Sequence, residues 1–355
     1  MKLQAMDYLV DPYTEEPLKL YQFEFDQQLD EVKAGILFNE ASGKWYPIHN
    51  YVPRICENGL FDNTSFRQRW EKQLSRYENG YSQFNADDQT EMGVLYDAEY
   101  KIYPNNGFGK LFNKEKDVFH TKSLYNEVDF LGSVCLDAGC GNGRYAYWAA
   151  LSGAKIVFAL DISANGIEAC HQNTAGMMVV PIQASINNLP FRKNIFDLIY
   201  SIGVLQYVQK YKDALTSIFR VTKLQGQFSL HVFQQQNSIY EKIDMIIKNR
   251  VSAYDHRSKE NFVKKIQNIS SILGSVGLLK LGNAFVHLET HEQSVFNWYF
   301  VPSLRRYEFD ELEQFCSTNG FKMIKSSNEK DKSNLMKFLV TLSPRSSFTQ
   351  KYQKC

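Results

Sequence analysis

The most constraining feature of this sequence is a short apolar run that ends in an acid and continues directly into glycines. Residues 134–150 have the sequence Val-Cys-Leu-Asp-Ala-Gly-Cys-Gly-Asn-Gly-Arg-Tyr-Ala-Tyr-Trp-Ala-Ala. The run is too short for a helix, and an amphipathic stretch begins at Tyr145. Glycine lets the chain reverse sharply and approach a ligand closely, because it has no Cβ. The pattern therefore predicts a strand, a tight loop and a helix whose first N–H groups face a ligand.

The spacing of the glycines excludes the dinucleotide-binding fingerprint. Counted from Gly139, the pattern G-x-G-x-x-G needs a glycine at position 144, where Arg144 stands. What remains is Asp-x-Gly-x-Gly-x-Gly, beginning at Asp137. This pattern resembles motif I of the class I S-adenosylmethionine-dependent methyltransferases, type 11-like. The resemblance implies that Asp137 helps to hold the amino-acid end of the cofactor and that the glycines pass beneath it.

Two later segments extend the resemblance in the right order. Asp161 follows a second apolar run, about 20 residues past the loop, where a carboxylate at a strand end would accept both ribose hydroxyls. Residues 182–191 and 196–207 are similar to the adenine loop and the fourth strand of the same family. The resemblance thus implies S-adenosyl-L-methionine as the cofactor. It implies as cofactor-binding residues Asp137, Ala138, Gly139, Cys140, Gly141, Asp161, Ile162, Ser185, Ile186 and Ser201.

Chain length and net charge limit the classes of protein to which this sequence can belong. A chain of 355 residues suits a core of roughly 200 residues with additions. Because 40 Lys and Arg residues nearly balance 39 Asp and Glu residues, nothing global favours a nucleic-acid or anionic-membrane partner. With no spanning apolar run and no signal-peptide core, we expect a cytoplasmic protein without a membrane partner. The six cysteines include no C-x-x-C pair, which predicts neither a disulfide framework nor a zinc site.

Residues 1–60 have the pattern of a small β-rich module of short strands and turns. The order of its Pro-containing turns resembles the zinc-ribbon module that activates tRNA and protein methyltransferases. The cysteines of that module would stand near Asp11, Thr14, Asn39 and Ser42, and none of these is cysteine. Metal binding is therefore not carried over. We expect a metal-free packing or dimerisation module, with a homodimer as one outcome, and substrate capture as the alternative.

Strand and helix patterns alternate through residues 131–234, which predicts an α/β fold with a doubly wound, mostly parallel sheet. The resemblance makes this a seven-stranded, Rossmann-like methyltransferase fold. Residues 61–130 are expected to form a helical lid or linker. Residues 235–305 are expected to form a helical insertion that caps the substrate. Residues 306–355 are expected to close the core, with strands at 321–326 and 335–342.

Methyl transfer requires a nucleophile held about 3 Å from a sulfonium methyl, in line with the breaking bond. A general base is needed only for acceptors such as alcohols. Tyr207 stands where relatives often have His, and with an ordinary pKa near 10 it would orient an acceptor. His231, at the end of the predicted fifth strand, could act as a base. Tyr299 could stack against a planar acceptor, although core packing is equally expected.

These patterns favour methyl transfer to oxygen, nitrogen or carbon of a small-molecule acceptor, such as a natural product or a sugar-like metabolite. One alternative is an rRNA or tRNA methyltransferase, since rRNA guanine methyltransferases also place a zinc ribbon before this core. The missing zinc ligands, the near-neutral charge and the lack of an N/D-P-P-Y motif argue against it. A second alternative is a non-catalytic cofactor-binding scaffold. Tyr207 and Asn297 motivate this scaffold alternative, because they stand where methyltransferase relatives usually have a His and an acid. The intact glycine loop argues against it.

Overall fold

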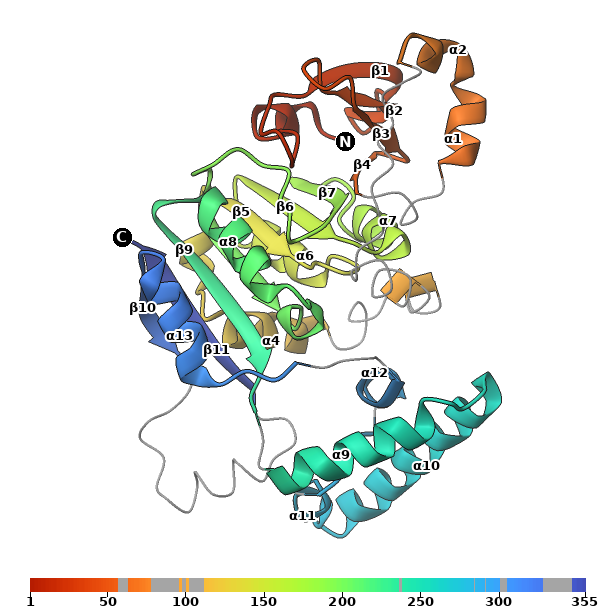
Figure 1. The fold of residues 1–355 in the computed structure, drawn as a ribbon, viewed down its shortest axis with the longest axis vertical. Helices are drawn as coiled ribbons and strands as arrows, with labels where there is room; N and C mark the ends of the chain where they lie inside the picture. Colours follow the sequence, from red (N-terminus) through yellow and green to blue (C-terminus); the bar gives the residue numbers. More distant parts are fainter. Residues whose placement is uncertain are drawn as a thin grey trace. The chain divides into compact units, whose positions relative to one another are not determined.

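The computed structural model describes residues 1–56, 63–77, 96–97, 100–101, 112–235, 238–283, 285–290, 292–300, 305–327 and 347–355. The chain divides into two compact units (Figure 1). The first contains residues 1–231, 313–326 and 349–355, and the second contains residues 232–312 and 327–348.

Seven strands of the first unit form the core sheet. In sheet order they are β7 (Val179–Ala184), β6 (Ile156–Asp161), β5 (Val134–Ala138), β8 (Phe196–Ile202), β9 (Thr222–Phe233), β11 (Ser347–Lys354) and β10 (Phe321–Ser326). The first five run parallel, and β10 and β11 pair antiparallel. Every residue of β5 and β7 is buried, as expected for strands covered on both faces. This architecture confirms the predicted doubly wound, Rossmann-like sheet.

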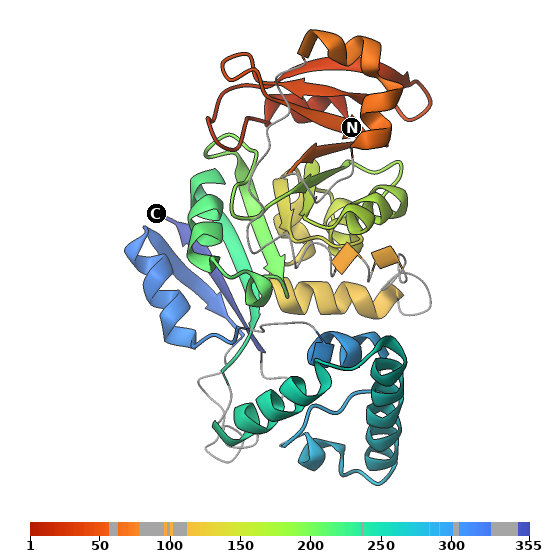
Figure 2. The same cartoon turned by 45° about the vertical axis from the view of Figure 1, so that its right-hand side comes forward.

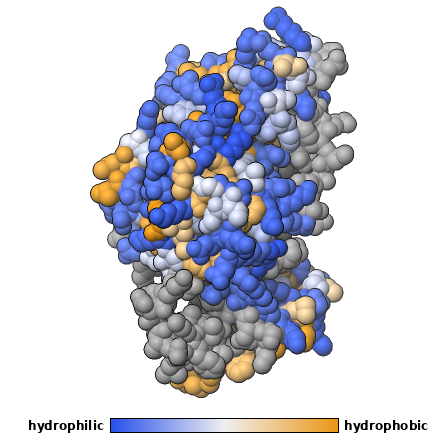
Figure 3. All heavy atoms as spheres, turned by 60° about the vertical axis from the view of Figure 1, so that its left-hand side comes forward, coloured by the Kyte–Doolittle hydropathy of each residue, from blue (hydrophilic) through white to orange (hydrophobic). Residues whose placement is uncertain are grey.

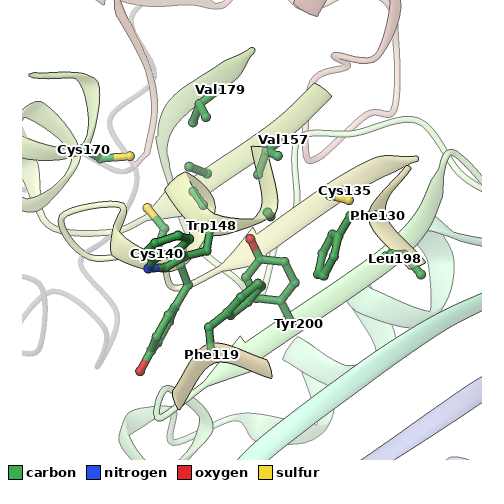
Figure 4. Packing of buried hydrophobic residues seen from close by; sticks show 14 of the residues in the cluster. Phe119, Phe130, Cys135, Cys140, Trp148, Val157, Cys170, Val179, Leu198 and Tyr200 are labelled. Atoms are coloured by element: carbon green, nitrogen blue, oxygen red, sulfur yellow. The ribbon is translucent and has the colours of Figure 1, made fainter. Parts of the chain in front are cut away.

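Helices cover both faces of this sheet (Figure 2). One face carries α4 (Phe112–Ser123), α5 (Glu127–Phe130), α6 (Arg144–Leu151) and α7 (Ala164–Asn173). The other carries α8 (Tyr211–Val221) and α13 (Phe309–Thr318), which meet through the rings of Phe219 and Phe315. Figure 4 shows the aromatic packing beneath the glycine loop, where Phe119 of α4 contacts both Phe130 and Tyr200. This packing fixes the position of β5 and β8.

The structure adds a closing strand that was not predicted. The strand predicted at residues 335–342 lies outside the described residues, and the antiparallel partner of β10 is β11, with Phe321 opposite Lys354. The polar composition of β11 hid it from a search for apolar runs. Its polar residues Thr349, Gln350 and Lys351 are buried. The half-buried Lys354 donates to the carbonyls of Phe219 and Thr222.

The N-terminal residues form the antiparallel strands β1 (Lys19–Asp26), β2 (Glu31–Phe38), β3 (Trp45–His49) and β4 (Val52–Ile55), after the 3-10 helix η1 (Leu3–Asp7). The following helices are α1 (Thr64–Arg69), α2 (Glu71–Leu74) and η2 (Ser75–Tyr77). Phe66 and Leu74 of these helices pack on Trp45 and Ile36. Strand β4 pairs parallel with β7. The module is therefore not a separate sheet, because it continues the core sheet to eleven strands.

The second unit is helical. It contains α9 (Ser238–Val251), α10 (His256–Ser275), α11 (Leu279–Gly282) and α12 (Glu292–Phe300). The helices predicted near residues 241–250 and 259–272 lie within α9 and α10. Tyr240, Val263, Leu288, Val295 and Trp298 form its core.

Apolar and polar side chains are mixed on the described surface. On the face shown in Figure 3, apolar side chains form small separate groups among polar ones. Among the described residues, no helix combines the length and the apolar character needed to cross a membrane.

Candidate cofactor-binding site

The glycine loop has the conformation that its sequence predicts. Gly139, Gly141 and Gly143 have φ angles of +91°, +54° and +84°, a region that other residues rarely adopt. A Cβ on Gly139 would lie 2.2 Å from Cγ2 of Val204. The N–H groups of Gly139 and Cys140 donate to the carbonyl of Leu160 at 2.7 and 2.9 Å. The loop is thus tied to the end of β6 and leads directly into α6.

Asp137 is a buried acid with unused hydrogen-bonding capacity. Its side chain lies at the end of β5 with 1% exposure. Within the described part of the chain, its Oδ2 has no hydrogen-bond partner. Burial, and then the charge of Asp161, raise the pKa of Asp137 well above its usual value. Such a group is satisfied when a ligand brings a donor or a positive charge.

Asp161 lies beside the glycine loop and also accepts a hydrogen bond from it. Its Oδ2 accepts from the N–H of Gly141 at 2.7 Å, and its Oδ1 accepts from the N–H of Ser163 at 2.9 Å. Burial raises the pKa of Asp161, although these hydrogen bonds oppose the shift. Each carboxylate oxygen has a further lone pair. Asp161 can therefore hold the loop and still accept ribose hydroxyls.

The turns after β7 and β8 carry further acceptors. Asn187 Oδ1 and Gln206 Oε1 are buried and have no partner in the described residues. The sequence patterns gave no reason to select either amide, since neither is a motif position. Of the predicted residues here, Ser185 accepts from the N–H of Asn187 at 3.1 Å, and Ser201 donates to the carbonyl of Ala138 at 2.8 Å. Ser201 thus joins β8 to β5.

Asp97, which the sequence analysis missed, reaches the start of α7. Its Oδ1 accepts from the N–H of Asn165 at 2.5 Å and from the hydroxyl of Ser163 at 3.2 Å. Its Oδ2 accepts from Nδ2 of Asn165 at 2.7 Å. Its charge also contributes to the raised pKa of Asp161. A single acid more than 60 positions away in sequence gives no pattern from which this contact could be predicted.

Two tyrosines near Asp97 also lie at the site. A Cβ on Gly141 would lie 2.0 Å from the hydroxyl oxygen of Tyr100. The ring of Tyr96 meets Tyr207 edge-on at 5.3 Å between centroids. These described residues of the predicted lid therefore contact the glycine loop, the start of α7 and the turn after β8.

His231 is held by a hydrogen-bonded chain. Its Nδ1 lies 2.9 Å from Oγ1 of Thr349, which donates to the carbonyl of Lys122 at 3.0 Å. The single hydroxyl hydrogen is used there, so Nδ1 carries the proton and Nε2 is the acceptor. Burial, and the charge of Lys122, lower the pKa of His231 to about 3. The N–H of Gly203 donates to the carbonyl of His231, which places His231 beside the turn after β8.

Tyr299 belongs to the core of the second unit, one of the two roles expected for it. It is 2% exposed, and its hydroxyl donates to the carbonyl of His287 at 2.7 Å. The neighbouring Trp298 stacks on His287 with centroids 4.1 Å apart and donates from Nε1 to Asp244. The Asn297 side chain lies outside what the structure describes.

The two N-terminal turns at the positions of the zinc-ribbon cysteines are held by hydrogen bonds. Asp11 Oδ1 accepts from the N–H groups of Tyr13 and Thr14, at 2.9 and 3.0 Å. Asn39 repeats this pattern with the N–H groups of Ala41 and Ser42. Nδ2 of Asn39 then donates to Oγ1 of Thr14 at 2.9 Å and joins the two turns. No group of three or more potential metal ligands occurs in the described residues.

Known proteins match the part of the chain that builds this site. A family profile described as "Methyltransferase domain" matches residues 136–230. The "tRNA U34 carboxymethyltransferase" of Ruthia magnifica subsp. Calyptogena magnifica is 32% identical over 117 residues, 31% of this chain and 34% of that protein. The "Malonyl-[acyl-carrier protein] O-methyltransferase" of Buchnera aphidicola is 35% identical over 114 residues, 32% of this chain and 44% of that protein. The chain thus spans less than half of either relative.

Among solved structures, magnesium protoporphyrin IX methyltransferase (ChlM) from Synechocystis PCC 6803, with bound SAM, aligns with a TM-score of 0.42 at 13% identity. The alignment covers 77% of this chain and all of that one. From the profile match and the motif order, residues 136–230 form a class I S-adenosylmethionine-dependent methyltransferase domain.

Proposed function

We propose that this chain is an S-adenosylmethionine-dependent methyltransferase that acts on a small-molecule acceptor. The observation that carries the proposal is the buried, partnerless oxygen of Asp137 next to Asp161, at the end of a strand that leads into the glycine loop. A cationic or donating ligand would satisfy this oxygen.

The residues present fit this cofactor. S-adenosylmethionine carries an ammonium group, two ribose hydroxyls and an exocyclic amine, which are all hydrogen-bond donors. The site offers acceptors in Asp137, Asp161 and Asn187. We assign Asp137 to the ammonium group, Asp161 to the ribose and the Ser185–Asn187 turn to the adenine. When bound, the cofactor supplies a methyl group on a sulfonium, with its own leaving group.

The remaining residues would position the acceptor. Since His231 stays neutral, its Nε2 can accept a hydrogen bond from a hydroxyl or amine of the acceptor and so orient it. A pKa lowered to about 3 makes this imidazole a weak base, which argues against the role as a general base expected from the sequence. The phenol of Tyr207, held edge-on by Tyr96, can orient the acceptor from the turn after β8. Both residues are proposed to orient the acceptor and not to be essential catalytic groups.

RNA is the second candidate acceptor. Relatives named as tRNA methyltransferases match this chain, but a malonyl-carrier-protein and a sterol methyltransferase match it as well. The near balance of positive and negative charges supplies no general attraction for phosphates. These points favour a small molecule.

Calorimetric titration with S-adenosylmethionine tests the proposal. Asp161→Ala should weaken binding at least about tenfold, because a charged hydrogen-bond acceptor contributes about 1.5–3 kcal/mol. Asp197→Ala is the matched control, since Asp197 accepts from the N–H of Val134 at the opposite ends of the strands. Equal affinity in wild type and Asp161→Ala would remove the ribose assignment, and no binding to wild type would overturn the proposed function. Incubation with methyl-labelled cofactor and either metabolite extract or tRNA then separates the two acceptor classes.

A further inference from the structure

We infer that Arg54 and Gln183 are positioning residues that couple the N-terminal module to the cofactor-binding turn. The inference rests on the proposed function, because it concerns the turn that would hold the ribose. It gives the module a role in cofactor binding that its sequence alone did not indicate.

The strand register brings three polar residues into one row across the sheet. Gln183 of β7 is the register partner of Arg54 in β4 and also of Asp161 in β6. The row therefore begins in the N-terminal module and ends at the acid proposed to bind the ribose. Parallel strands present register partners to the same edge of the sheet.

Hydrogen bonds run from Arg54 through Gln183 to the turn after Asp161. Nη1 of Arg54 donates to Oε1 of Gln183 at 3.0 Å, and Nε2 of Gln183 donates to the carbonyl of Ile162 at 2.9 Å. A guanidinium only donates and a carbonyl only accepts, so the Gln183 amide has a single satisfactory orientation. Arg54 also pairs with Glu168 of α7 at 2.5 Å. Four parts of the sheet and its helices thus meet at Arg54 and Gln183.

The chain of contacts ends in the glycine loop. Ile162 lies between Asp161, which accepts from Gly141, and Ser163, which caps α7. A displacement of the Ile162 carbonyl would move the acid and the loop that it holds. Arg54 and Gln183 are 1% and 0% exposed, so water cannot replace a lost hydrogen bond easily. Coupling through these groups should therefore be strong.

The test is Gln183→Glu, which breaks only the second link. The new carboxylate can still pair with Arg54, but it cannot donate to the Ile162 carbonyl and places an oxygen against it. We expect the dissociation constant for S-adenosylmethionine to rise about tenfold, the loss of one buried hydrogen bond.

The matched control is His171→Phe. His171 also joins the module to α7, through a 3.3 Å contact with Glu31 and a stack on Tyr51, but it does not touch Ile162. The variant keeps the stack and loses the polar contact, so cofactor affinity should stay within about twofold of wild type. Arg54→Met is a second test variant, and it should weaken binding in the same direction as Gln183→Glu.

The outcomes separate the two proposals. Binding by wild type with unchanged affinity in Gln183→Glu would overturn the coupling and leave the proposed function intact. Absence of binding by wild type would overturn the proposed function itself. If Gln183→Glu does not fold, Arg54→Met decides, and unchanged affinity there would also overturn the coupling. Equal weakening in His171→Phe and Gln183→Glu would assign the effect to general loosening of the module and overturn the inference.

Discussion

Two buried aspartates in different turns of the first unit have pKa values shifted in opposite directions. Asp11, in the N-terminal module, is 0% exposed, and Asp137, before the glycine loop, is 1% exposed. Burial alone would raise the pKa of Asp11, but hydrogen bonds from Asn39, Tyr46 and two backbone N–H groups outweigh it and lower that pKa. The pKa of Asp137 is raised instead, by burial and by the charge of Asp161.

The difference fits the proposal that Asp11 is a structural acid and that Asp137 binds a ligand. The oxygens of Asp11 accept from the N–H groups of Tyr13 and Thr14 and from the hydroxyl of Tyr46. Asp137 retains an oxygen without a partner among the described residues. Native proteins leave buried polar groups unsatisfied mainly where function requires it. Burial of an acid therefore says less about its role than its hydrogen-bond partners do.

Glycine substitutions should give the largest effect in this comparison. Gly43, in the second N-terminal turn, and Gly139 both have positive φ, but a Cβ on Gly43 meets nothing within 4 Å. Gly43→Ala should therefore cost only about 1–2 kcal/mol of stability and leave cofactor affinity unchanged. Gly139→Ala adds a clash with Val204 and should weaken cofactor binding about a hundredfold or more, equivalent to about 3 kcal/mol. Calorimetry and urea unfolding of both variants would measure this, and equal affinities would contradict it.

Asparagine substitutions should separate stability from binding. Asp11→Asn should lower the free energy of unfolding at neutral pH by about 1–3 kcal/mol, because charged hydrogen bonds are lost, and leave cofactor affinity unchanged. Asp137→Asn should keep or raise the free energy of unfolding, since it removes a charge that burial disfavours, while weakening cofactor binding about tenfold. Thermal melts and titrations of the two variants test this directly. If Asp137→Asn were the less stable of the two, Asp137 would be a structural residue.

The pH dependence of these two substitutions should have opposite sign. The lowered pKa of Asp11 contributes stability that is present above its unfolded pKa of about 3.9 and is lost as the pH falls. The raised pKa of Asp137 contributes stability that is present below about 3.9 and is lost as the pH rises. Below pH of about 4, the penalty of Asp11→Asn should shrink as the pH falls, whereas above pH of about 4 Asp137→Asn should become progressively more favourable relative to wild type as the pH rises. Parallel trends in urea unfolding would contradict the assignment.

Local sequence patterns were enough to predict the parallel strands of the core sheet and the glycine loop. The apolar runs around Val134, Ile156 and Leu198 gave the parallel strands, and the glycines at 139, 141 and 143 gave the loop. Asp161 was selected correctly as a strand-end acid, but its hydrogen bond to Gly141 was not foreseen. These successes share a cause, because a strand, a tight turn and a helix start each leave a signal within a few neighbouring residues.

Contacts between distant residues left no such signal. Strand β11 is polar and was not predicted. Asp97 contacts the start of α7, and Arg54 reaches the turn after β6 through Gln183, both from outside the recognised motifs. The pairing of β4 with β7, which joins the N-terminal strands to the core sheet, was not predicted either. In each case the partners are chosen by register and burial, which are properties of the folded sheet.

The amino-acid sequence by itself determined a doubly wound sheet with a glycine loop and two acids at its edge, since backbone sterics and apolar periodicity act over short distances. Only the tertiary structure decided which polar groups are satisfied: Asp11 is held by its own turn and His231 by Thr349, whereas Oδ2 of Asp137 has no partner among the described residues. The reason is physical, because the cost of burying a polar atom depends on the partners that folding brings to it.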